Sequence, residues 1–206
     1  MKLLTFIFLI GLLNSCNNSD EIISFDKIIL TKGTFRLADE FQENFPDSME
    51  FKSPESYFVF DARSILKITN REFVVYLDEY QNGNRGYYKG VLNDTTVNRF
   101  NKLINKVKFN SIEDPILMSN NKNMIYDGYS YFLFLTNKNK TERIEFIDPK
   151  YYKKEFFELI NFLDNLDEKT ILHRLQDSTK VNDEFNELIY SIVHSQRDKF
   201  PHLKNK

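Results

Sequence analysis

Apolar and polar residues follow two different periods along this chain, and the change of period marks the expected elements. Residues 73–77 are β-branched and aromatic, an Asn-Gly pair at 82–83 favours a hairpin turn, and 86–92 returns as a partner strand. Asn93 or Asp94 then caps a helix with one apolar face. That face comprises Val97, Phe100, Leu103, Ile104 and Val107. The pattern predicts a strand–strand–helix unit.

The same order of elements recurs later in the chain. Strands are expected at 129–136 and 142–147, around a polar turn at 137–140. Asp148-Pro149 then begins a helix, with a capping residue followed by proline in the first turn. Its apolar face comprises Phe156, Phe157, Leu159, Ile160, Leu163 and Leu166.

The two units align with one another when Phe100 is placed on Phe156, which also places Val91 on Ile147. Since neither unit can bury its apolar face alone, we expect the two hairpins together to form a four-stranded sheet, the core of the fold, with both helices on one side. The alternative is a chance resemblance between two generic hairpin–helix units. The predicted fold class is α+β, with an antiparallel sheet built from a tandem strand–strand–helix unit.

Additional N-terminal strands are expected to join this sheet. Apolar and β-branched runs predict strands at 22–30, 57–60 and 64–69, with a turn at 32–33. The α+β domain is therefore expected to span residues 22–166.

A helical C-terminal extension is expected over 167–206. The apolar residues of 171–175 predict a short helix, and a longer amphipathic helix follows and ends before Phe200-Pro201. The apolar residues of the longer helix are Val181, Phe185, Leu188, Ile189, Ile192 and Val193. This helix either packs on the same core or forms a separate contact arm.

The start of the chain has the pattern of a processing signal. Lys2 supplies a positive charge, and residues 3–13 form an apolar run shorter than the roughly 20 residues of a membrane-spanning helix. The next residues, Leu13-Asn14-Ser15-Cys16, resemble the lipobox of bacterial lipoproteins. The resemblance implies cleavage between Ser15 and Cys16 and acylation of Cys16, including palmitate, as a membrane anchor. The alternatives are an ordinary secretory signal with a chance cysteine and a buried apolar N-terminal helix.

This reading divides the start of the chain into a signal peptide at 1–15 and a polar tether at 16–21. In the lipoproteins that the chain resembles, aspartate directly after the cysteine retains the protein at the inner membrane. Asn17 stands there instead, which favours the outer membrane, on its periplasmic or its surface face. Cys16 is the only cysteine, so the rest of the chain has no thiol for a disulfide, for catalysis or for a metal.

A second resemblance covers under half of the chain. It rests on a hairpin, the segments GYYKGVLNDTTVNRFNKLINKVKF and DGYSYFLFL, and a final helix. In this order they look like one of the small domains of unknown function found in lipoproteins of AT-rich Gram-negative bacteria. No catalytic residues carry over from this resemblance.

The charge balance, the histidine positions and the absence of known motifs limit the functions that the sequence predicts. The chain has 28 basic and 30 acidic side chains, whereas a nucleic-acid-binding protein usually has a basic excess, so no nucleic-acid partner is expected. His173, His194 and His202 are far apart and have no cysteine to join them, whereas zinc needs three or four ligands. No catalytic motif, metal site or cofactor is predicted.

Two tyrosine pairs are the candidate binding residues: Tyr87 with Tyr88, and Tyr151 with Tyr152. We expect one ring of each pair in the core and the other on an exposed recognition patch. Their alternative role is aromatic packing in a chain rich in Phe and Tyr.

Three triplets match a pattern that some Gram-negative bacteria O-glycosylate on exported proteins. The residues that would be modified are Ser48, Thr95 and Ser178. Thr95 lies near an expected helix start and has capping as its alternative role.

Taken as a whole, the sequence predicts a non-catalytic lipoprotein anchored to the outer membrane. Its expected partners are the membrane, through the N-terminal lipid, and another envelope protein that it binds or scaffolds. The alternative is an enzyme or ligand receptor acting on envelope or extracellular glycans or peptides, with carboxylates brought together by the fold.

Overall fold

The computed structural model describes residues 25–37, 58–78, 85–112, 128–167 and 170–199. The helices are α3 (Asp94–Ile104), α5 (Lys154–Asp164) and α6 (Thr179–Lys199), with short 3-10 helices η2 (Phe109–Ser111) and η3 (Pro149–Tyr151). The strands are β1 (Lys27–Leu37), β2 (Phe58–Thr69), β3 (Glu72–Leu77), β4 (Gly86–Val91), β5 (Ser130–Asn137), β6 (Lys140–Phe146) and β7 (His173–Arg174).

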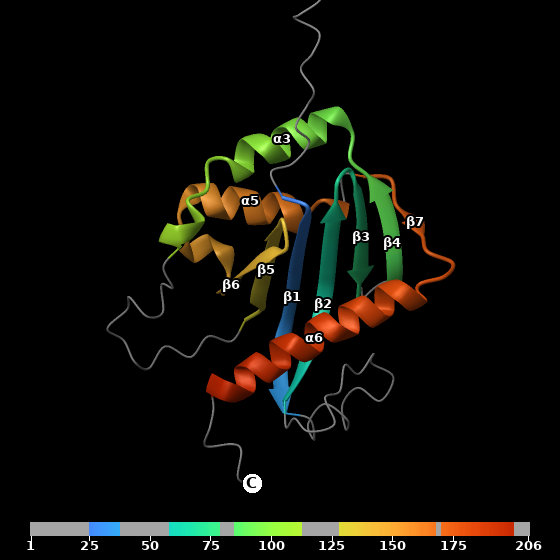
Figure 1. Ribbon diagram of the computed structural model, residues 1–206, viewed down its shortest axis with the longest axis vertical. Helices are drawn as coiled ribbons and strands as arrows, with labels where there is room; N and C mark the ends of the chain where they lie inside the picture. The colour runs from blue at the N-terminus through green and yellow to red at the C-terminus, as the bar shows by residue number, and fades with distance from the viewer. Residues whose placement is uncertain (1–24, 38–57, 79–84, 113–127, 168–169, 200–206) are drawn as a thin grey trace, which may run out of the picture.

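The strands of the described residues form one seven-stranded sheet in the order β6-β5-β1-β2-β3-β4-β7, and each neighbouring pair is antiparallel. Helices α3 and α5 cover one face, and α6 crosses the other face diagonally (Figure 1). The predicted α+β class, the antiparallel sheet and the C-terminal helix are confirmed. None of the helices in the described part of the chain is both long enough and apolar enough to cross a membrane.

Both strand–strand–helix units are present, as β3-β4-α3 and β5-β6-α5, with both helices on the same face of the sheet. Their hairpins do not pair with each other directly. Strand β1 pairs with β5, and β2 pairs with β3, so the two long N-terminal strands lie between the units. The expected strands at 57–60 and 64–69 are one continuous strand, β2.

The turn expected at Lys32-Gly33 is wrong, because both residues lie inside β1. The register of β1 against β2 shifts between Lys32 and Gly33, which marks a β-bulge. A Cβ atom on Gly33 would lie 2.4 Å from the carbonyl oxygen of Asp61 and 2.7 Å from the ring of Phe60. Glycine is therefore required here for the close approach of the two strands and not for a change of chain direction.

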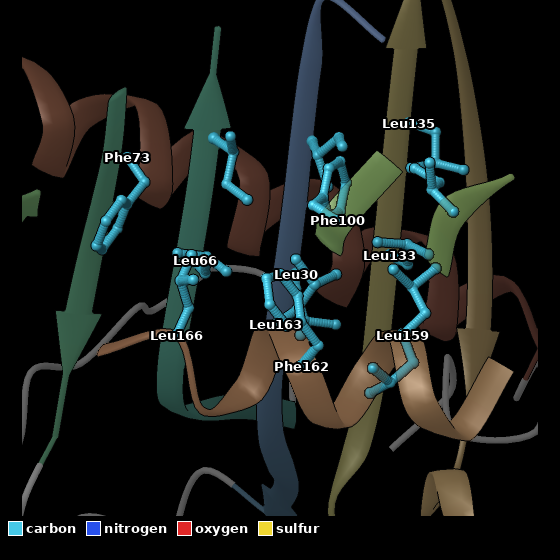
Figure 2. Close-up of a cluster of buried hydrophobic side chains, with 14 of the residues drawn as sticks. Leu30, Leu66, Phe73, Phe100, Leu133, Leu135, Leu159, Phe162, Leu163 and Leu166 are labelled. Atoms are coloured by element: carbon cyan, nitrogen blue, oxygen red, sulfur yellow. The ribbon is translucent and has the colours of Figure 1, made fainter. Parts of the chain in front are cut away.

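The larger core lies between the sheet and helices α3 and α5. Figure 2 shows leucine side chains of the sheet and Phe73 facing side chains from both helices. The labelled residues are Leu30, Leu66, Phe73, Phe100, Leu133, Leu135, Leu159, Phe162, Leu163 and Leu166. Of the apolar residues predicted for α5, Phe157 differs, because it lies on the solvent side of the helix and is 37% exposed.

Helix α6 forms a second core on the opposite face of the sheet. Its buried residues are Phe185, Ile189, Ile192 and Val193. They pack on a set of sheet residues that includes Ile29, Phe60, Ile65, Tyr76, Tyr87, Phe132 and Phe134. Polar contacts fix the helix at both ends of the sheet: Tyr87 donates to Asn182, and Arg143 donates to Ser195. Of the two arrangements that the sequence left open, α6 packs on the sheet.

Two local predictions differ from the structure. Residues 171–175 do not form a helix, because His173 and Arg174 form β7 on the outer edge of β4, where they satisfy edge backbone groups of that strand. Asp148 caps η3, with its carboxylate accepting from the backbone N–H of Lys150, and α5 begins only at Lys154.

Candidate functional site

A groove of about 710 Å³ lies where η2 approaches the start of α5. It is lined by Lys106, Val107, Lys108, Ser111, Ile112, Tyr151, Tyr152, Lys153, Lys154, Glu155, Phe156 and Glu158. One wall is the segment that comes after α3 in the chain, residues 106–112. The other wall comprises the end of η3 and the first turns of α5. The groove thus lies between the segment after α3 in the first unit and the start of α5 in the second, on the face of the sheet that α3 and α5 cover.

Local hydrogen bonds hold both walls. On the first wall, the Ser111 hydroxyl donates to the carbonyl oxygen of Lys108 at 2.9 Å. On the second, the Tyr152 hydroxyl accepts from the backbone N–H of Ile147 at 3.3 Å. The Tyr152 ring also packs on Phe156 at a centroid distance of 5.4 Å, so this half-buried tyrosine joins the groove to the core.

Tyr151 stands at the groove with 44% of its surface exposed. The ammonium of Lys150 lies 5.0 Å from the centre of its ring, a cation–π distance. Lys150 also pairs with Asp148 at 2.8 Å, and the hydrogen bond to that carboxylate raises the pKa of Lys150. These contacts leave the Tyr151 ring accessible to a ligand.

The lining of the groove has a positive excess, with lysines at 106, 108, 153 and 154 and glutamates at 155 and 158. Lys154 pairs with Glu158 along α5 at 3.7 Å. Within the described part of the chain, Lys106, Lys108 and Lys153 make no ion pair. The groove therefore offers two net positive charges beside exposed aromatic and apolar surface, which suits an anionic ligand.

The other tyrosine pair is placed differently. Tyr87 and Tyr88 are neighbours on β4, so their rings enter the two opposite cores of the sheet. Tyr87 is 7% exposed and donates from its hydroxyl to the Asn182 side-chain oxygen at 2.6 Å. Burial raises the pKa of Tyr87 to about 12, with a smaller electrostatic contribution from the nearby Tyr76. The structure thus brings Tyr151 and Tyr152 to the groove and places Tyr87 and Tyr88 in the cores.

A second charged cluster comprises two residues within β2, one residue directly after β3 and one directly before β4. Arg63 pairs with Asp61 at 3.0 Å and with Asp78 at 3.4 Å, while Arg85 approaches Asp78 at 3.3 Å. The Arg85 Nε also donates to the Tyr76 hydroxyl at 3.2 Å. Since arginines neutralise both carboxylates, this cluster joins strands of the sheet and presents no open pair of acids.

The remaining predicted residues fall in three places. Ser15, Cys16 and Ser48 lie outside the described residues. Thr95 is exposed in the first turn of α3, where the cap is provided by Asn93, whose side chain accepts from the backbone N–H of Thr96. Ser178 is half-exposed just before α6. The described ranges contain no group of three or more His, Cys, Asp or Glu side chains that could hold a metal ion.

The four lysines of the groove are the site residues that sequence reasoning missed. They occur as the local runs KVK at 106–108 and KK at 153–154, and each run alone is typical of a solvated surface. The two runs are 45 residues apart, counted from Lys108 to Lys153, and they do not occupy matching positions in the two repeated units, so the sequence carries no signal that links them.

Comparison of the chain with models of known protein families finds no match, and comparisons with curated proteins and with solved structures find none either.

Proposed function

We propose that the protein is a lipid-anchored lipoprotein of the cell envelope with a non-catalytic binding role. The proposed location of its anchor is the outer membrane. The groove between η2 and α5 is its binding surface. The observation that carries this proposal is the combination in one concavity of a positive excess, the exposed ring of Tyr151 and apolar lining residues. Such a mixture of apolar lining and a few convergent polar groups is typical of binding sites.

The position of the groove fits an anchored protein. The ring of Phe25, at the start of the described chain, packs on Phe109 of η2 at a centroid distance of 6.2 Å. Lys108 and Ser111, on either side of Phe109, line the groove. Covalent geometry limits the chain from Cys16 to Phe25 to about 30 Å. The acylated cysteine of this proposal therefore holds the groove close to the membrane.

The proposed ligand is an anionic component of the envelope. Lysine binds phosphate or carboxylate as a mobile point charge and needs no fixed partner geometry. The ring of Tyr151 and the half-buried side chains of Val107 and Ile112 add apolar contact.

Photo-crosslinking in living cells tests this proposal. A photoreactive phenylalanine analogue replaces Tyr151 in one strain and Tyr190 in another; Tyr190 is 50% exposed on α6 and serves as the matched control. We expect adducts to one class of envelope component from position 151 and not from position 190, identified by mass spectrometry. No adduct from position 151, or the same adducts from both positions, would contradict a binding role for the groove.

A further inference from the structure

We propose that the groove docks on the phosphate headgroups of anionic phospholipids in the same membrane that holds the Cys16 anchor. The docking fixes which face of the domain points toward the membrane. This inference rests on the proposed function and names the ligand of its groove.

The charge of the groove is local and comes from two separate parts of the chain. The whole chain has a formal net charge of −2, yet the groove gathers four lysines against two glutamates. Lys108 precedes η2 and Lys153 precedes α5, so the fold and not the composition brings them together. Anionic membrane surfaces attract clustered lysines of this kind.

Aromatic side chains on the same side of the domain suit a membrane interface. Tyr151 is 44% exposed at the groove, and Phe157, outside the groove lining, is 37% exposed in the first turn of α5. Tyrosine combines an apolar ring with a polar end and is enriched at membrane interfaces, and lysine extends an apolar stem toward a charged headgroup. The Tyr151 ring beside four lysines forms a surface with both kinds of contact.

The path of the chain places this surface at the membrane. Phe25 packs on Phe109 of η2, so the chain enters the domain beside the groove. With at most about 30 Å of chain between the acylated Cys16 and Phe25, headgroups stay at a high effective concentration around the groove. Helix α6 covers the opposite face of the sheet and points away from the membrane in this orientation (Figure 1).

Two anionic ligands are considered for the groove: phospholipid headgroups and an acidic segment of a protein. The anchor keeps headgroups next to the groove at all times, which favours the phospholipid. Both match the charge of the groove, but only the lipid is held beside it by the anchor. Two net positive charges near an anionic surface favour the docked orientation by about 30-fold.

The test uses the full lipidated chain, purified from membranes and reconstituted into vesicles. Cys16 is the only cysteine, so once it is acylated an introduced cysteine is the only free thiol. Ser111→Cys places a thiol in the groove and Ser191→Cys places one on α6 as control. The two serines are matched, since each hydroxyl donates to the carbonyl oxygen three residues earlier. The rate of maleimide labelling is measured in vesicles with phosphatidylglycerol and in vesicles of phosphatidylcholine alone.

We expect labelling of Ser111→Cys to slow by about 30-fold in the anionic vesicles only, with Ser191→Cys unchanged. Adding Lys108→Gln and Lys153→Gln should abolish the protection, because these changes remove the two net charges. Adding Lys89→Gln and Lys180→Gln, two exposed lysines on other elements, should leave the protection intact.

Three results would overturn the inference. Equal labelling in both kinds of vesicle, with the protein floating with the vesicles, would refute docking on lipid and leave the anchored binding protein standing. Protection by added polyglutamate but not by anionic lipid would assign the groove to an acidic protein segment. Failure to float with any vesicle would remove the anchor on which the inference and the proposed function both rest.

Discussion

Replacing Phe185 by alanine is predicted to destabilise the whole domain and not α6 alone. Phe185 has 0% of its surface exposed and lies at the centre of the contact between α6 and the sheet. Its ring is 6.0 Å from that of Tyr87 on β4. The helix therefore closes a core, and a cavity at this position weakens the packing of the strands beneath it.

The expected loss is a large part of the total stability. Truncating a fully buried phenylalanine to alanine costs about 3–5 kcal/mol in free energy of unfolding. Folded domains of ordinary stability have only about 5–15 kcal/mol. With a urea dependence of about 2 kcal/mol per molar, the midpoint of unfolding should fall by about 2 M.

Urea unfolding followed by far-ultraviolet circular dichroism and by tyrosine fluorescence measures this loss. Tyr190→Ala is the control on the same helix, because Tyr190 is 50% exposed and its ring stacks on that of His194, on the same helix, at a centroid distance of 6.0 Å. The control should lower the free energy of unfolding by no more than about 0.5 kcal/mol, so its urea midpoint should move little. If Phe185→Ala shifts it no further than the control does, α6 is a separate arm and the packing argument is refuted.

Three further predictions concern single positions. Gly33→Ala should lower the free energy of unfolding by about 1–3 kcal/mol, measured by urea unfolding, because the new Cβ would lie 2.4 Å from the Asp61 carbonyl oxygen. Asn93→Ala removes the cap of α3 and should cost about 1 kcal/mol in the same assay, whereas an unchanged midpoint would exclude the cap as a stabilising contact. Because the folded pKa of Tyr87 is raised to about 12, its contribution to stability is complete below pH 10 and is lost as the pH rises toward 12. In Tyr87→Phe, the free energy of unfolding should therefore fall less between pH 9 and pH 12 than it does in the wild type. If the variant loses as much stability over this range as the wild type, another group causes the loss.

Local periodicity was enough to predict the two repeated units. The hairpins and helices depend on residues close in sequence, such as the Asn93 cap and the 3.6-residue spacing of Val97, Phe100 and Ile104. The order of strands depends on contacts between distant parts of the chain, which periodicity does not contain. The continuous run Ile28-Ile29-Leu30 was the available signal, because a strand with apolar residues on both faces must be covered on both sides.

Only the part of the candidate site that depends on local sequence was predicted. Tyr151 and Tyr152 follow a recognisable cap and proline, and both line the groove. Tyr87 and Tyr88 alternate across a strand covered on both faces, so Tyr87 is buried in one core and Tyr88 is half-buried against the other. The groove lysines converge only because the segment after α3 meets the start of α5, a contact between two separate units that no short stretch of sequence records.

The measurement that tests the central claim most directly is metabolic labelling with an alkyne analogue of palmitate, followed by membrane fractionation. The anchored lipoprotein predicts label in the wild-type chain, recovery of that chain with the outer membrane, and loss of the label in Cys16→Ser. A wild-type chain without label, or a Cys16→Ser chain labelled to the same extent, would contradict the anchor and with it the placement of the groove at the membrane.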